Sequence, residues 1–257
     1  MSRTTRRIAL IVALLSVFAL PGITTANHSW AGYHWARTSN PLTLSLGDNV
    51  SSAWDPYLAT TSSDWSVSTV LNTTTVPGAG ASKRRCPWTS GRVEVCDYAY
   101  GYNGWLGVAQ IYVSGSHITQ GQVRLNDSYF NTSTYGSSAW RNMVMCQEVG
   151  HTLGLDHQDT NFSNANLGTC MDYTSNPSGP PSNEHPNAHD YAQLVTIYTH
   201  LDSTTTALQT APGKNADPAE LGQWGQLVAL TNGGRTSVYV LDAGGGLQVV
   251  TFVIWAG

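Results

Sequence analysis

The chain has 257 residues, which is enough for one sizeable domain and a small additional segment. Hydrophobic residues make up 41% of the chain and charged residues 11%, so it can build a core and is not expected to be disordered. The formal net charge is −4, and no block of Lys and Arg forms a basic stripe, which excludes a nucleic-acid-binding protein as a class.

The first residues have the pattern of an export signal. Arg3, Arg6 and Arg7 precede the uncharged apolar run 8–20, and the small residues 24–26 follow. Because the run is too short to span a bilayer comfortably, we expect residues 1–26 to be a signal peptide, with no membrane association after cleavage. An uncleaved membrane anchor is the alternative interpretation. The mature protein is expected to be secreted.

Most predicted strands precede the main helices. Alternating apolar and polar residues predict strands over residues 42–46, 65–71, 105–113 and 118–125. Gly47 and Asp48 are expected to end the first strand, and residues 73–87 are expected to form a loop.

Three segments have helical spacing instead. Helices are predicted from Asn49 or Ser51 to Thr61, over residues 139–153 and over residues 189–201. Gly154 is expected to end the second of them. Strands followed by a central helix, a loop and a final helix indicate an α+β, or mixed α/β, domain.

The C-terminal part differs in composition from this domain. Residues 203–218 are rich in Thr and Ala and are expected to be a linker. In the β-rich segment 219–257, two strand-like runs, 237–241 and 247–254, flank three consecutive glycines and predict a hairpin. A packing appendage and a surface-binding module both fit this segment.

Four cysteines in an exported chain indicate two disulfides. Cys86 and Cys96 flank a short polar segment, which favours a local loop closed by a bond between them. Cys146 and Cys170 would then form the second bond.

The most informative stretch of the sequence reads C-Q-E-V-G-H-T-L-G-L-D-H and begins at Cys146. Gln147 and His151 are four residues apart and therefore lie on the same face of a helix. Gly154 allows the backbone to turn sharply after them. This turn is expected to bring His157 back towards His151.

The spacing suits metal-assisted hydrolysis. A catalytic zinc ion takes three protein ligands and keeps one position for water, and a carboxylate such as Glu148 collects the proton of that water. The pattern E-x-x-H-x-x-G-x-x-H is specific when a turn containing methionine follows it. Such a turn is present at residues 169–173, with Met171 at its centre.

With this helix motif and this turn, the chain resembles the metzincin metallopeptidases, in particular the matrixin-like group. The resemblance covers residues 33–202. It implies a twisted sheet, an active-site helix, a Met-turn and a C-terminal helix, followed here by the small β-rich tail. It also implies a secreted zinc endopeptidase that acts on peptide or protein substrates and uses one catalytic Zn²⁺.

The resemblance implies a role for each matching residue. Glu148 would be the general base, His151 and His157 would be zinc ligands, and Met171 would lie under the metal. Tyr173 stands where astacin-like and serralysin-like members have a tyrosine that helps to stabilise the transition state, by coordination or by a hydrogen bond to the oxyanion.

The resemblance also bears on the substrate cleft and on control of activity. Strand 105–113 or 118–125 would form the cleft edge that holds an extended peptide by backbone pairing. A bond between Cys146 and Cys170 would tie the active-site helix to the Met-turn. No propeptide with a cysteine precedes residue 33 after the expected cleavage site, so we expect control to come from export or from an inhibitor.

The chain departs from the family pattern at Gln147, which replaces the first ligand histidine. In one interpretation Gln147 coordinates zinc through its oxygen, or Tyr173 or water completes the site, and the protein is a protease. In a second, the metal is lost and the domain is a pseudoprotease that binds a peptide or protein. In a third, Cys146 and Cys170 join two histidines in a structural zinc site. Retention of the other motif residues favours the enzyme.

The remaining features carry less information. No D-x-D-x-D run indicates structural calcium, and the sequence does not predict an oligomeric state. Pro186 argues against a continuous helix that would join His185 and His189 in a second metal site. The other histidines are interpreted as isolated structural or exposed residues: His28, His34, His117 and His200.

Overall fold

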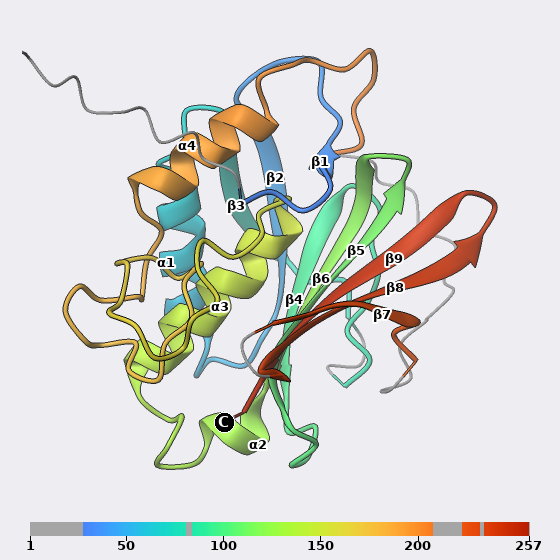
Figure 1. Ribbon diagram of the computed structural model, residues 1–257. Coiled ribbons are helices and arrows are strands. Elements are labelled where there is room, and N and C mark those ends of the chain that lie inside the picture. The colour runs from blue at the N-terminus through green and yellow to red at the C-terminus, as the bar shows by residue number, and fades with distance from the viewer. Residues whose placement is uncertain (1–27, 81–83, 208–222, 232–233, 257) are drawn as a thin grey trace, which may run out of the picture.

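The computed structural model describes residues 28–80, 84–207, 223–231 and 234–256 (Figure 1). The expected signal peptide and most of the expected linker lie outside the described residues. Within these ranges the protein has a mixed α/β fold with one twisted mixed sheet and few helices.

The sheet contains nine strands in the order β3-β2-β4-β6-β5-β9-β8-β7, with β1 paired to β6 beside this path. Its strands β2, β3, β4 and β6 are parallel, whereas β5 and the C-terminal strands run antiparallel to their neighbours. The strands are β1 (His34–Trp35), β2 (Leu42–Asn49), β3 (Leu71–Pro77), β4 (Arg92–Tyr98), β5 (Trp105–Ser114), β6 (His117–Asn126), β7 (Gln226–Thr231), β8 (Thr236–Gly244) and β9 (Leu247–Trp255).

The helices α1, α3 and α4 cover one face of this sheet, as Figure 1 shows. The main core lies between them and the strands and contains the buried tryptophans Trp35, Trp54 and Trp65. The four helices are α1 (Asp55–Trp65), α2 (Asp127–Phe130), α3 (Ser138–Thr152) and α4 (Ala188–Ile197). Within the described residues, no helix is long and apolar enough to cross a membrane.

The predicted strand over residues 65–71 is wrong. Trp65 ends α1, which buries Leu58, Thr61 and Ser62 together with Trp65 on a single helical face. Val67, which suggested alternation, is 65% exposed in the turn that follows. The strand begins only at residue 71, so it occupies part of the segment that was predicted to be a loop.

Three further elements differ from the predicted ones in their boundaries. Helix α1 begins at Asp55 and ends at Trp65, whereas it was predicted to run from Asn49 or Ser51 to Thr61. Strand β2 continues through Gly47 and Asp48, because β3 pairs with it on one side and β4 on the other. Helix α4 ends at Ile197, four residues before the predicted end at 201. The predicted strands 105–113 and 118–125 and the predicted helix 139–153 are present with small shifts at their ends.

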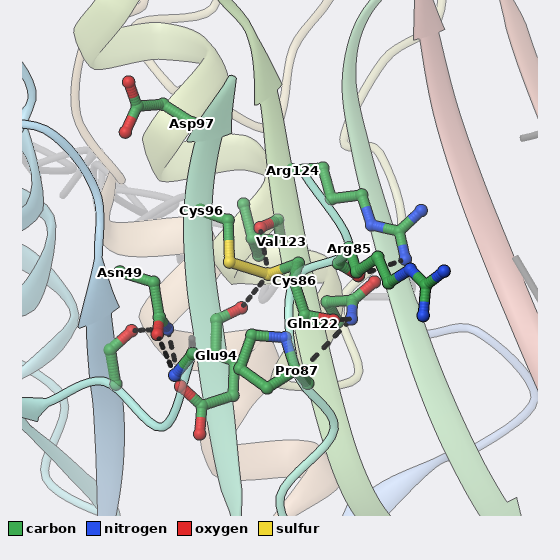
Figure 2. The surroundings of a disulfide bond; sticks show 12 residues. Asn49, Arg85, Cys86, Pro87, Glu94, Cys96, Asp97, Gln122, Val123 and Arg124 are labelled. Atoms are coloured by element: carbon green, nitrogen blue, oxygen red, sulfur yellow. Dashed lines mark hydrogen bonds between the residues drawn. A yellow bond between two sulfur atoms is a disulfide. The ribbon is translucent and has the colours of Figure 1, made fainter. Parts of the chain in front are cut away.

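Strand β4 was not predicted, because acidic and basic residues interrupt its apolar pattern. Its Glu94 is fully buried, and its carboxylate accepts hydrogen bonds from Arg92 and from Asn49 of β2. The disulfide between Cys86 and Cys96 joins this strand to the preceding loop (Figure 2). The second disulfide links Cys146 and Cys170, and two disulfides fit an extracellular protein.

The C-terminal segment continues the central sheet. Strand β9 pairs with β5 along its whole length, from Trp105 opposite Trp255 to Ser114 opposite Leu247. The predicted hairpin is present as β8 and β9, and β7 adds the outermost strand. The C-terminal segment therefore lies beside β5 in space, although the two are far apart in sequence.

Candidate active site

Helix α3 positions three of the motif residues. Ser137 begins the helix by accepting a hydrogen bond from the backbone N–H of Trp140. Gln147, Glu148 and His151 follow on its C-terminal half and are all buried. These three residues of the candidate site therefore lie on a buried helix and not on a surface loop.

Gly154 allows the chain to turn back from the end of α3 towards His157. Its φ is +96°, which L side chains rarely adopt, and its neighbours leave no room, because a Cβ there would lie 2.1 Å from the carbonyl oxygen of Tyr33. The backbone N–H of Trp30 also bonds the carbonyl oxygen of Gly154 at 3.2 Å. The N-terminal segment thus packs directly against the turn.

Replacing Gly154 with alanine is expected to lower the free energy of unfolding by about 3 kcal/mol, through positive φ and a backbone clash. Gly101 provides a matched control, because its φ is +95° and no atom lies within 4 Å of a Cβ placed there. Gly101→Ala is expected to cost only about 1 kcal/mol. Urea unfolding of both variants measures the difference, and equal costs would contradict the role of the Tyr33 contact.

His151 and His157 form a close pair with fixed tautomers. Their ring centroids lie 4.5 Å apart. Nδ1 of His151 lies 2.9 Å from the carbonyl oxygen of Leu155, so it donates its proton there and leaves a lone pair on Nε2. Nδ1 of His157 lies 3.2 Å from a carboxylate oxygen of Asp156. Burial, reinforced by repulsion from His157, lowers the pKa of His151 to about 3, which keeps the ring neutral and ready to act as a ligand.

The turn around Met171 packs against α3 at Gly150. A Cβ on Gly150 would lie 2.6 Å from Sδ of Met171, so only glycine at this position of α3 lets the methionine pack so closely. The side chain of Tyr173 lies next to His157, with 4.6 Å between ring centroids. The disulfide between Cys146 and Cys170 joins this turn to α3 covalently.

Gln147 is bound to the same turn. Its side-chain Nε2 donates a hydrogen bond of 2.9 Å to the carbonyl oxygen of Cys170. Its other polar atom, Oε1, is buried and has no hydrogen-bond partner among the described residues. The hydrogen bond from Nε2 thus fixes the orientation of the amide. The lone pairs of Oε1 remain available to coordinate a cation.

Glu148 lies against β5 in a space that Gly107 provides. A Cβ on Gly107 would lie 2.5 Å from Oε1 of Glu148. Neither carboxylate oxygen has a hydrogen-bond partner within the described part of the chain. Burial raises the pKa of Glu148 well above its usual range. No local sequence pattern pointed to Gly107 as a site residue, because it lies on β5, far from the helix motif in sequence.

The donor atoms fit a metal ion. Gln147 Oε1 and His157 Nε2 are buried polar atoms without partners among the described residues, and such atoms are rare unless water or an ion completes them. No third His, Cys, Asp or Glu joins His151 and His157, since the one close group of at least three such residues in the described chain lies elsewhere. A metal ion held by His151 and His157 would therefore need a further ligand, for which Gln147, Tyr173 and water are the candidates. The disulfide rules out the alternative zinc site built from Cys146 and Cys170.

The C-terminal strands cover this site. The ring of Phe252 on β9 stacks on His151, with 4.5 Å between centroids and 5° between planes. The hydroxyl of Thr236 on β8 lies beside Tyr173, whose pKa burial raises well above its usual range. Next to His157 a cavity of only about 70 Å³ is left, which suits water rather than a peptide. The sequence analysis assigned no site role to Phe252 or Thr236.

The expected cleft edge is occupied by the same segment. Strand β5 pairs with β6 on one side and with β9 on the other, and β6 pairs with β4 and β5. Neither predicted strand thus offers a free edge to a substrate in this structure.

The interpretation of His34, His117 and His200 as isolated residues is wrong. Nε2 of each lies within 3.6 Å of Oδ1 of Asp202. His185 instead contacts Asp64, and the remaining two histidines, His28 and His189, stack on each other. Because these histidines come from distant segments, the sequence spacing did not indicate the cluster.

No family model and no curated protein matches the sequence. Among solved structures, the chain is similar to myroilysin, with a TM-score of 0.35 and 14% identity over 64% of this chain and 96% of that chain. It is also similar to high choriolytic enzyme 1, a hatching enzyme zinc-protease from Oryzias latipes (medaka fish), with a TM-score of 0.38 and 12% identity over 68% of this chain and 98% of that chain.

Proposed function

We propose that this chain is a secreted zinc endopeptidase that its own C-terminal strands hold in a latent state. The site at the end of α3 would hydrolyse a peptide bond in an extended substrate once β8 and β9 have moved away. One observation carries the proposal: Gln147, Glu148 and His157 have buried polar atoms without hydrogen-bond partners among the described residues, and Phe252 stacks on His151 beside them.

Three side chains are proposed as zinc ligands: His151, His157 and Gln147. Zinc supplies, when bound, a positive charge that polarises water and the peptide carbonyl group. Gln147 is the weakest of the three donors, because a neutral amide oxygen binds zinc less well than an imidazole nitrogen. Its hydrogen bond to the backbone of Cys170 holds the amide in one orientation, which reduces the entropy lost on binding.

Glu148 and Tyr173 would carry the proton and charge transfers. The carboxylate of Glu148 accepts a proton from the attacking water and later donates it to the leaving amine. The hydroxyl of Tyr173 donates a hydrogen bond to the oxygen that becomes negative when the carbonyl carbon is attacked. Both groups are buried beside the histidine pair, where water is excluded and such interactions are strong.

The sheet indicates how a substrate would bind. An extended peptide that replaced β9 would find the same row of backbone groups on β5. It would then pass over His151, where Phe252 now lies. Unfolded or extended protein segments are therefore the proposed substrates.

A catalytically degenerate binding module is the alternative. It is favoured by the hydrogen bond from Gln147 to the backbone of Cys170, because this bond gives the buried amide a structural role that needs no metal. In that case a peptide or protein strand would pair with β5 in place of β9 without being cleaved.

A peptidase assay with an unfolded protein substrate separates the two functions. The enzyme is expected to cleave it, to lose activity in a chelator and to regain activity when zinc is added. The assay is run on the full chain and on protein whose C-terminal strands have been loosened by substitution. A binding module would leave the substrate uncut in every condition while retaining affinity for it.

A further inference from the structure

A second cluster of metal-ligating side chains lies apart from the candidate active site. It joins His34 of β1, His117 at the start of β6, and His200 and Asp202, which follow α4. The Nε2 atoms of His34, His117 and His200 lie 3.6, 3.2 and 3.6 Å from Oδ1 of Asp202, respectively. Nε2 of His200 is also 3.1 Å from Nε2 of His34.

Four of the six ligand separations of a zinc coordination tetrahedron are given by these distances, and each is close to the length of a tetrahedron edge. With zinc–nitrogen and zinc–oxygen bonds of about 2.0–2.1 Å, ligand atoms lie about 3.3–3.4 Å from one another. Ligand atoms of His34, His117 and Asp202 all lie within 4.8 Å of one another, the one such group among the described residues. His200 lies outside this group of three, but its Nε2 approaches the same carboxylate oxygen and Nε2 of His34, and a rotation of its half-exposed side chain would bring it in as a fourth donor.

The tautomer of His34 favours a cation. Its Nδ1 lies 2.8 Å from the carbonyl oxygen of Gly32 and donates its proton there. The lone pair of Nε2 therefore points towards Nε2 of His200, from which it can accept a hydrogen bond, and towards the Asp202 carboxylate. The side chain of His34 is buried, so these protein groups, rather than solvent, surround that lone pair. A metal ion placed between the rings would accept all of these lone pairs at once.

Asp202 is held in the orientation that such a site needs. Its Oδ2 accepts hydrogen bonds from the backbone N–H of Arg37 at 3.1 Å and from the guanidinium of Arg37 at 3.2 Å. The backbone N–H of Asp202 donates to the carbonyl oxygen of Arg37 at 2.8 Å. Oδ1 is thereby directed towards the histidines. Hydrogen bonds of this kind orient the ligands of metal sites.

We propose that His34, His117, His200 and Asp202 form a structural zinc site, separate from the candidate active site. Four protein donors leave no position for a substrate, which is typical of structural rather than catalytic zinc. The ion would join the N-terminal segment, the turn between β5 and β6, and the segment after α4. Through the N-terminal segment it would stabilise the contact of Trp30 with the Gly154 turn.

Zinc content of the full chain tests this proposal in a His157→Ala background, which removes a proposed active-site ligand. Adding His117→Ala is expected to lower the content by about one zinc per chain and to abolish the visible absorption of tetrahedral cobalt when Co²⁺ replaces zinc. Chelator is expected to lower the melting temperature of the His157→Ala protein by several degrees but not that of the double variant.

His185→Ala is the matched control, because it also removes a histidine in contact with an aspartate, outside this cluster. It is expected to keep the zinc. Asp202→Asn, which keeps the side-chain shape, replaces His117→Ala should that variant fold poorly. A His157→Ala protein without zinc, or equal zinc with and without His117, would overturn the proposal.

Discussion

Replacing Phe252 with alanine is expected to raise the rate of peptide hydrolysis by up to about 100-fold. If only molecules with displaced C-terminal strands are active, the rate follows the population of that open state. Removing a buried Phe side chain costs about 3–5 kcal/mol, and the loss falls on the contact of β9 with His151. Steady-state hydrolysis of a quenched fluorescent peptide measures the change.

Phe130→Ala is the control for general destabilisation. Phe130 is a fully buried phenylalanine that packs on Trp54 and takes no part in the C-terminal strands. This variant is expected to lose stability by a similar amount without a gain in hydrolysis. A Phe252→Ala protein no more active than the wild type, or an equal gain in Phe130→Ala, would contradict the latent state.

In the Phe252→Ala background, Glu148→Gln is expected to lower the catalytic rate by about 10²–10⁴-fold, because the amide cannot accept a proton from water. Glutamine has nearly the same shape, so the space beside Gly107 stays filled and the fold is expected to remain intact. The catalytic rate and the circular dichroism spectrum are measured together.

Glu184→Gln makes the same chemical change outside the site, where Glu184 accepts a hydrogen bond from Asn142. It is expected to leave the rate within about twofold of its background, as surface substitutions usually do. A Glu148→Gln protein that retains full activity would show that the hydrolysis comes from another group or another protein.

The sequence predicted the parts of the site that lie close together along the chain. Spacing on one helix was enough to place Gln147 beside His151, and Gly154 was enough to predict the turn to His157. These relations depend on the 3.6-residue period and on the conformational freedom of glycine, which a single sequence reveals. The helix that carries them is present over Ser138–Thr152.

The parts that depend on distant contacts were not predicted. The role of β9 rests on its pairing with β5, and the register of two strands so far apart in sequence leaves no local pattern. Strand β4 was missed because its Glu94 is buried, and the side chains that bond its carboxylate include Asn49 of β2 and Thr89 of the preceding loop, which the sequence pattern does not place there. The cluster around Asp202 escaped notice for the same reason, since its histidines come from three regions of the chain.

Zinc binding by His151, His157 and Gln147 is tested by the metal content of the protein in a His117→Ala background. That background removes the proposed structural zinc and leaves the active-site residues unchanged. We predict about one zinc per chain, lost on adding His157→Ala. A folded His117→Ala protein without zinc, which gains zinc on Gln147→His, would contradict the account and indicate a scaffold that binds its partners without catalysis.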